Sequence, residues 1–190
     1  MLTAALAASL LAAAPVAAAK DRPVSDHTNA VSVVALAVIE PRLEVDFDRA
    51  LSDKTSFTAG ATVGRYNNIL LRLFNTLSPE KFTINQMGAF GSYNFHFKHF
   101  NRGWYGSGIA RYDRVSATFG DESAGGYNRV TVGPAIGWKV ATEGGFTFKW
   151  DLGLGYSTVF GYAGGDGNGS IGEPEGALGG LGSLNLGYSF

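Results

Sequence analysis

Few residues of this 190-residue chain could carry acid–base or nucleophilic chemistry, because it has three histidines and no cysteine. His27 lies near the N-terminus, whereas His96 and His99 stand close together in the segment HFKH. A serine hydrolase needs a histidine that contacts both a serine and a carboxylate, and a metal site needs ligands beyond two histidines. Neither set is evident around these positions. We therefore expect no catalytic residue, no metal site and no cofactor.

A second candidate for chemistry is the segment DGNGSIGEPEGA, which has the length of a calcium-binding loop. In an EF-hand loop that begins at Asp166, Asn168 and Ser170 would fall at the third and fifth positions. The sixth position, however, is Ile171 instead of glycine, and the twelfth is Ala177 instead of glutamate. The segment is therefore predicted to be a surface loop.

The remaining charged residues follow a regular pattern, in which they alternate with apolar ones. In residues 42–48 the charged side chains are separated by Leu43, Val45 and Phe47. A period of two residues is the pattern of a β-strand with two different faces. Residues 56–66, 129–141 and 146–157 show the same alternation of apolar residues with polar or small ones. The sequence thus predicts an all-β protein.

The predicted connections between strands alternate in length. The shorter ones are residues 50–55, 98–103 and 141–145, and the longer ones are 66–81, 120–126 and 161–177. Short turns at one end and longer loops at the other are typical of bacterial outer-membrane barrels, which have an even number of strands. We therefore predict an eight-stranded antiparallel up-and-down transmembrane β-barrel. Its predicted strands are residues 29–38, 42–49, 55–66, 82–97, 104–118, 127–140, 145–160 and 177–190. A single long strand over residues 29–49, which would leave seven strands, is the alternative.

Two prolines and two registers need separate treatment. Pro41 suits a tight outer turn at residues 39–41, and Pro134, inside a predicted strand, predicts a β-bulge because proline cannot donate to the ladder. The pattern leaves the registers of residues 29–38 and 104–118 open. For the second of these, the cost of turning Arg111 and Asp113 toward lipid favours placing both side chains inside the barrel.

The chain divides into a removable leader and one domain. Residues 1–19 are almost entirely apolar and end in three alanines, as is typical of a secretory signal peptide; a membrane anchor is the alternative. After them we expect an N-terminal segment at residues 20–28 and a barrel at 29–190. A net charge of −1 offers no basic surface for nucleic acid, and we expect a monomer.

Alternation alone does not say which face of the strands is inside. A soluble lipocalin-like barrel would turn its apolar face inward around a ligand, whereas a membrane barrel turns it toward lipid. Aromatic residues gather near both strand ends, for example Phe100 and Trp104 at one end and Tyr127 and Phe160 at the other. Two such girdles are typical of proteins that cross two membrane interfaces. The residues of the polar face are mostly small, which suits a narrow barrel interior. We therefore expect the polar face to point inward and the apolar face to point toward lipid.

In these features the chain resembles the small outer-membrane β-barrels of Gram-negative bacteria, the OmpA/OmpX-like group, over essentially its whole length after the leader. In that group a final phenylalanine, preceded by apolar or aromatic residues at alternate positions, is the signal that the outer-membrane assembly machinery reads. The resemblance implies this role for Leu184, Leu186, Tyr188 and Phe190. It also implies a location in the cell outer membrane and a ladder of salt bridges inside the barrel.

The predicted register places ten charged residues on the inward face, five of each sign. They are Arg42, Glu44, Asp46, Asp48, Arg111, Asp113, Arg129, Lys139, Lys149 and Asp151. Isolated charges in a narrow interior are costly, whereas paired ones are tolerable, so we expect ion pairs. Because the interior of an eight-stranded barrel is just wide enough for its own side chains, a closed plug is favoured over a gated ion path.

Arg65 and Arg114 are predicted to face outward near the end of the barrel that carries the longer loops, and Arg72 is expected among the lipid headgroups in the loop at residues 66–81. Arg65, Arg72 and Arg114 could form a collar that binds the phosphates of lipopolysaccharide; snorkelling without a specific lipid is the alternative.

The expected function is that of a non-enzymatic outer-membrane protein that acts in envelope structure or in surface interaction through its loops. The alternatives are a secreted lipocalin-like barrel with an apolar ligand and a lipid-modifying outer-membrane enzyme.

Overall fold

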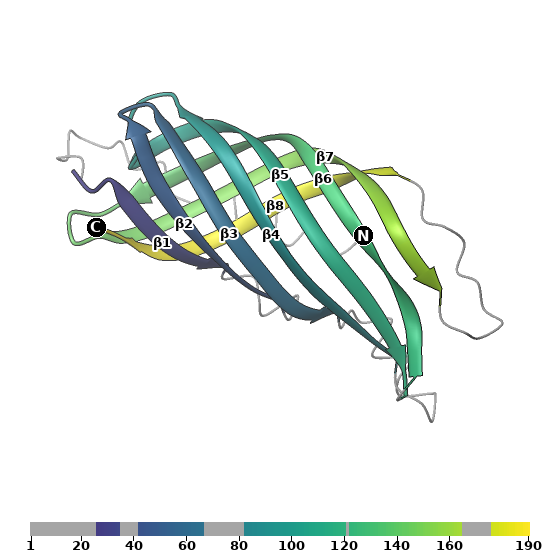
Figure 1. Ribbon diagram of the computed structural model, residues 1–190. Coiled ribbons are helices and arrows are strands. Elements are labelled where there is room, and N and C mark those ends of the chain that lie inside the picture. Colours follow the sequence, from purple (N-terminus) through teal and green to yellow (C-terminus); the bar gives the residue numbers. More distant parts are fainter. Residues whose placement is uncertain (1–25, 35–41, 67–81, 121, 165–175) are drawn as a thin grey trace, which may run out of the picture.

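The computed structural model describes residues 26–34, 42–66, 82–120, 122–164 and 176–190. Eight antiparallel strands form one closed barrel in chain order, so the predicted all-β up-and-down barrel and its strand number are confirmed (Figure 1). The strands are β1 (Asn29–Val34), β2 (Arg42–Ser52), β3 (Thr55–Tyr66), β4 (Phe82–His96), β5 (Arg102–Phe119), β6 (Glu122–Ala141), β7 (Phe146–Gly164) and β8 (Ala177–Ser189). The predicted leader at residues 1–19 and the predicted turn at 39–41 lie outside the described residues.

The first and last strands close the barrel. Ser32 of β1 lies opposite Asp46 of β2 on one side and Gly187 of β8 on the other. Just beyond this ladder, the backbone N–H of Asn29 donates to the carbonyl of Phe190 at 3.0 Å, and the N–H of Phe190 donates back to Asn29 at 2.8 Å. The edges of the sheet therefore satisfy each other, which removes the unpaired edge that an open sheet would present.

The alternation of side chains continues around the barrel. Even-numbered residues of β1 to β4 point inward, as do odd-numbered residues of β5 to β8 up to the register shifts near Gly126 and Ala117. The parity changes at the β4–β5 turn, where His96 lies opposite Tyr105, because paired residues share a face. The side chain of Asp48 is 2% exposed, whereas that of Leu154 is 67% exposed. In β5, Asp113 is fully buried. The register that the pattern left open therefore places Arg111 and Asp113 inside the barrel.

We call the end of the barrel with the turns β2–β3, β4–β5 and β6–β7 the turn end; the C-terminus lies there (Figure 1). The opposite end, where β5 and β6 meet near Gly120, is the loop end. The prediction of a long loop at residues 120–126 is wrong, because β5 continues to Phe119 and β6 already begins at Glu122. Backbone pairing satisfies polar main-chain groups whatever the side chains, so this hairpin extends through small and polar residues. Gly120 has a φ of 59°, a conformation that favours glycine at this turn.

The predicted bulge at Pro134 is also wrong. The β6–β7 ladder pairs Val132 with Tyr156 before the proline and Ala135 with Gly153 after it, in the same register. On the other side Pro134 lies directly opposite Gly108 of β5. The strand therefore accommodates the missing N–H of the proline because its pairing with β7 is interrupted at residues 133 and 134, without an inserted residue.

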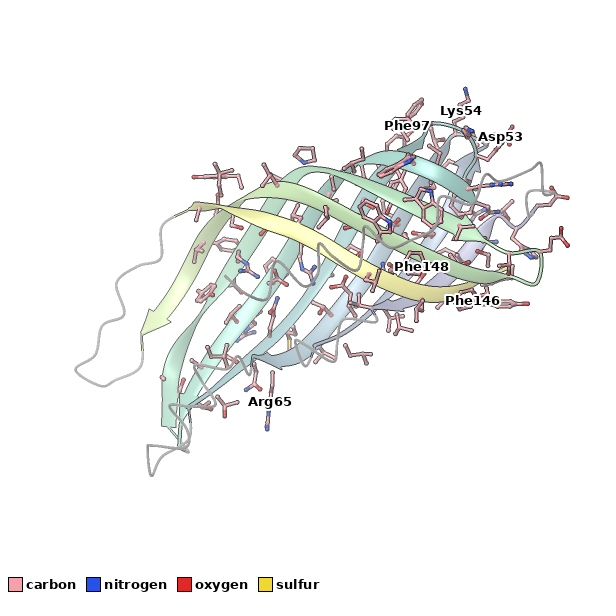
Figure 2. The ribbon with its side chains drawn as sticks, turned by 180° about the vertical axis from the view of Figure 1, so that it is seen from behind. Asp53, Lys54, Arg65, Phe97, Phe146 and Phe148 are labelled. Atoms are coloured by element: carbon pink, nitrogen blue, oxygen red, sulfur yellow. The ribbon has the colours of Figure 1, made fainter. Side chains whose placement is uncertain are left out.

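Two of the aromatic residues predicted to belong to the girdles at the strand ends lie on the inner face of the barrel. Phe100 is 5% exposed and buried at the turn end, and Tyr127 lies opposite the inward-facing Val115 of β5. Other aromatic residues do face outward near the turn end, and Figure 2 shows Phe97 beside the turn at Asp53 and Lys54, with Phe146 farther around the same end. The turn-end girdle is thus present in part, with one of its predicted members turned inside.

Candidate functional site

The charged side chains inside the barrel form two clusters. The loop-end cluster consists of Glu44, Arg111, Asp113 and Arg129. Arg111 joins the two carboxylates, since its Nη2 lies 2.6 Å from Glu44 Oε2 and its Nε lies 3.2 Å from Asp113 Oδ1. Arg129 Nη2 lies 2.9 Å from Asp113 Oδ2, and Gln86 Nε2 donates to Asp113 Oδ1 at 2.8 Å. The fully buried Asp113 carboxylate therefore has three donors, as a buried charge requires.

The turn-end cluster consists of Asp46, Asp48, Lys139 and Lys149. Lys149 Nζ lies 3.0 Å from Asp46 Oδ2 and 3.2 Å from Asp48 Oδ1, and Lys139 Nζ lies 3.2 Å from Asp48 Oδ2. Asn185 Nδ2 donates to Asp46 Oδ2 at 2.9 Å. Two ammonium groups thus share two carboxylates in the most buried part of the network, where unpaired charges would be very costly.

A small cavity separates the two clusters. It measures about 50 Å³ and is lined by residues of both, including Glu44 and Lys149. Asp151 also lines it and accepts a hydrogen bond from Ser183 Oγ at 2.7 Å. A cavity of this size has room for a few water molecules and is far smaller than the roughly 300–1,000 Å³ of a typical ligand pocket. Between the two clusters the interior is therefore filled mainly by the side chains of the protein itself.

A ring cluster of His96, Phe100 and Tyr105 lies buried inside the barrel at the turn end. The Phe100 ring packs against His96, with 5.5 Å between centroids, and Lys139 Nζ lies 3.6 Å from the centroid of Phe100. His96 also packs against Tyr105 at 5.3 Å and shares a 2.9 Å hydrogen bond with Ser56. The side chain of His96 therefore lies buried inside the barrel.

Nine of the ten charged residues predicted to face inward have described side chains, and the structure places all nine inside the barrel. They are Glu44, Asp46, Asp48, Arg111, Asp113, Arg129, Lys139, Lys149 and Asp151. The side chain of Arg42 lies outside the described part of the structure. Eight of the nine meet in ion pairs, whereas the bond that the structure assigns to Asp151 is with a serine.

The network is completed by uncharged polar residues that are not among the predicted site residues. Besides Gln86 and Asn185, Asn94 donates to Ser56 Oγ at 3.1 Å and to Thr58 Oγ1 at 2.9 Å. The Thr58 hydroxyl in turn donates to Asp48, so the ring cluster is linked to the turn-end cluster. All these residues stand at inward positions of their strands, so the alternation that located the charges could have located them as well.

Those of the remaining predicted residues that the structure describes lie on the outer wall. Arg65 and Arg114 are exposed, and Figure 2 shows Arg65 projecting from the outside of the ribbon; Arg72 lies outside the described residues. Of the predicted assembly signal, Leu186, Tyr188 and Phe190 are exposed on the outer face, and Leu184, partly exposed, shares their side of β8.

The described side chains offer little for catalysis or metal binding. Ser56 and His96 form a hydrogen-bonded pair of the type that activates a nucleophile, but they are 1% and 2% exposed, so a substrate has no access to them. Among the described residues, no three His, Asp or Glu side chains are placed to hold a metal ion. That part of the chain also contains no helix long and apolar enough to span a membrane. Comparison with protein-family models, with curated proteins and with solved structures finds no match to this chain.

Proposed function

We propose that this protein is an integral β-barrel of the bacterial outer membrane, without enzymatic activity, whose interior is closed by a charge network. It contributes to envelope structure or to surface interactions through its outer loops. The observation that carries the proposal is the inverted polarity of the barrel, with ion pairs inside and apolar side chains outside.

The exterior supports this orientation. Every strand turns at least one exposed large apolar side chain outward, for example Phe57 of β3, Met87 of β4 and Leu152 of β7. Soluble monomers rarely expose contiguous apolar patches larger than a few hundred Å². The strands β2 to β8 have between 11 and 20 residues, which meets the roughly 9–11 residues that a tilted strand needs to cross a bilayer.

The interior argues against the alternative of a secreted lipocalin-like barrel. A carrier of an apolar ligand needs an apolar cavity of some hundreds of Å³, whereas this interior holds buried ion pairs around a cavity of about 50 Å³. Its fully buried side chains include Lys139, Asp48 and Asp113. The same filling supports a plug in preference to a general pore.

Lipid contacts are the second part of the proposal. Arg65 and Arg114 lie on β3 and β5, opposite Asn85 and Met87 of the intervening β4. Since neighbouring strands are about 4.8 Å apart and residues about 3.4 Å apart along a strand, their Cα atoms are about 12 Å apart on one side of the wall. We propose that both guanidinium groups, with Arg72, bind the phosphates of lipopolysaccharide.

Cell fractionation tests the membrane assignment. We expect recovery from outer membranes only with detergent, and a heat-dependent shift in gel mobility of the folded barrel. Free release on osmotic shock would instead support the soluble carrier. Replacing Arg65, Arg72 and Arg114 with Gln should weaken lipopolysaccharide binding, whereas Arg49→Gln, near the turn end of β2, is the control that should leave it unchanged. Equal binding by the triple variant and the control would remove the collar from the proposal.

A further inference from the structure

A groove of about 560 Å³ lies on the outer wall of the barrel, across strands β3 to β6. Four outward-facing residues form a row across these strands, in the order Phe57, Tyr93, Gly108 and Pro134, each directly opposite the next. A Cβ atom added at Gly108 would meet no atom within 4 Å. The missing side chain therefore leaves a gap between the rings of Tyr93 and Pro134.

The groove continues toward the loop end over small residues. The next row of outward residues includes Gly91 and Ala110, which lie opposite each other on β4 and β5. The row after that contains Ala89 on β4, opposite Tyr112 of β5. A strip of small side chains thus runs from the gap at Gly108 of β5 across to β4, toward the loop end, with aromatic rings beside it.

Arg65 and Arg114 form a cationic site near the loop end of this strip. Arg114 lies four positions beyond Ala110 on β5, about 13 Å along the strand, and Arg65 lies on the other side of β4. None of the described outward-facing side chains of β3 to β6 is acidic. The site is therefore complementary to an anion, and its separation from the groove is comparable to the roughly 15 Å half-thickness of a bilayer core.

We propose that the groove binds one acyl chain of a lipopolysaccharide molecule whose phosphate is held by Arg65 and Arg114. This inference rests on the proposed function, since it requires the outer wall to face lipid. A chain lying on a smooth wall touches protein on one side, whereas a chain in the groove also touches Tyr93 and Pro134 at its flanks. Between apolar surfaces in a membrane, such additional packing is the main source of affinity.

Substitutions that fill the groove test the proposal. In Gly108→Leu the new side chain enters open space, and Ala110→Leu fills the same groove from the next row. The matched control is Gly180→Leu, because Gly180 also has open space at its Cβ position and faces outward opposite Leu154, away from the groove. Each full-length variant is purified from outer membranes in mild detergent. Its affinity is measured for lipid A and for deacylated lipid A, which keeps the phosphates but lacks the chains.

We expect both groove-filling variants to bind lipid A about tenfold more weakly than the wild type, which corresponds to about 1.4 kcal/mol. Their affinity for deacylated lipid A should not change, and Gly180→Leu should bind both ligands normally. Arg65→Gln with Arg114→Gln should weaken the binding of both. Wild-type affinity of both filled variants for lipid A would overturn the proposal, as would an equal loss for the deacylated form.

Two further outcomes concern other occupants of the groove. A wild-type dimer that Gly108→Leu disperses, with unchanged lipid A affinity, would assign the groove to a second copy of the chain. Preferential retention of phosphatidylglycerol over lipid A would assign it to a different lipid. Either result overturns the proposal. Recovery of the wild type from the soluble fraction would refute the proposed function itself, whereas membrane-bound, heat-modifiable variants with unchanged affinity would refute the groove alone.

Discussion

Removal of the Asp48 carboxylate tests whether the turn-end cluster holds the barrel together. Lys149 would keep Asp46 as a counter-charge at 3.0 Å, but Lys139 is 1% exposed and Asp48 is its ion-pair partner among the described residues. Asp48→Asn therefore leaves a buried ammonium group whose nearest stabilising contact is the ring of Phe100.

The expected cost follows from the geometry. Breaking a buried ion pair by removing one partner typically costs about 3–5 kcal/mol, which is a large part of the roughly 5–15 kcal/mol that stabilises a typical domain. Lys139→Met should cost less, about 1–2 kcal/mol, because it loses one contact to Asp48 and the cation–π contact, whereas the Asp48 carboxylate retains Lys149 and Thr58. The double variant should be more stable than Asp48→Asn alone, because it buries no unpaired charge.

Urea unfolding of the protein in lipid vesicles, followed by tryptophan fluorescence and by the gel mobility of the folded form, measures these differences. With a slope of about 2 kcal/mol per M, Asp48→Asn should lower the midpoint by about 2 M. Asp53→Asn, in the exposed β2–β3 turn (Figure 2), is the control and should stay within about 0.5 kcal/mol of the wild type. An unchanged midpoint for Asp48→Asn, or a double variant as unstable as Asp48→Asn, would refute the reasoning.

Three other perturbations test separate features. A Cβ atom at Gly137 would lie 2.5 Å from Tyr105 Oη and 2.5 Å from the carbonyl oxygen of Trp150, so Gly137→Ala should destabilise the barrel by about 1–3 kcal/mol in the same assay. Gly106→Ala, which enters open space, should not. Phe190→Ala should lower the amount of barrel in outer membranes while the purified protein refolds normally, because the backbone bonds of residue 190 to Asn29 are kept; equal losses in both measurements would contradict a role in assembly. Planar-bilayer recordings of the wild type should show no steady conductance, and a stable open level would contradict a closed interior.

Much of the fold could be predicted because the faces of a strand follow from backbone geometry. In residues 42–48 the alternation was sufficient to assign Glu44, Asp46 and Asp48 to one side. Where the pattern was ambiguous, in β5, the cost of exposing Arg111 and Asp113 to lipid assigned the register. Both arguments need only local sequence and the energetic cost of a misplaced charge.

The extent of the strands could not be predicted in the same way. Residues 122–126 fall within the loop predicted at residues 120–126, yet they belong to β6, which pairs with β5. Pairing depends on whether a partner backbone continues alongside, and local composition does not show this. The same limit explains Pro134, whose ladder keeps its register because the neighbouring strands hold it in place.

The sequence by itself determined which charged residues lie inside the barrel, because the alternation of strand faces and the cost of a misplaced charge apply to each position separately. Which cation meets which carboxylate is a property of the closed barrel. Lys149 binds Asp46, which lies 103 positions away in the sequence. The ring of Phe100 packs against Lys139, although the local pattern predicts that Phe100 belongs to the aromatic girdle on the outer face. These contacts depend on the tilt and stagger of the strands, which are set only when β1 and β8 join.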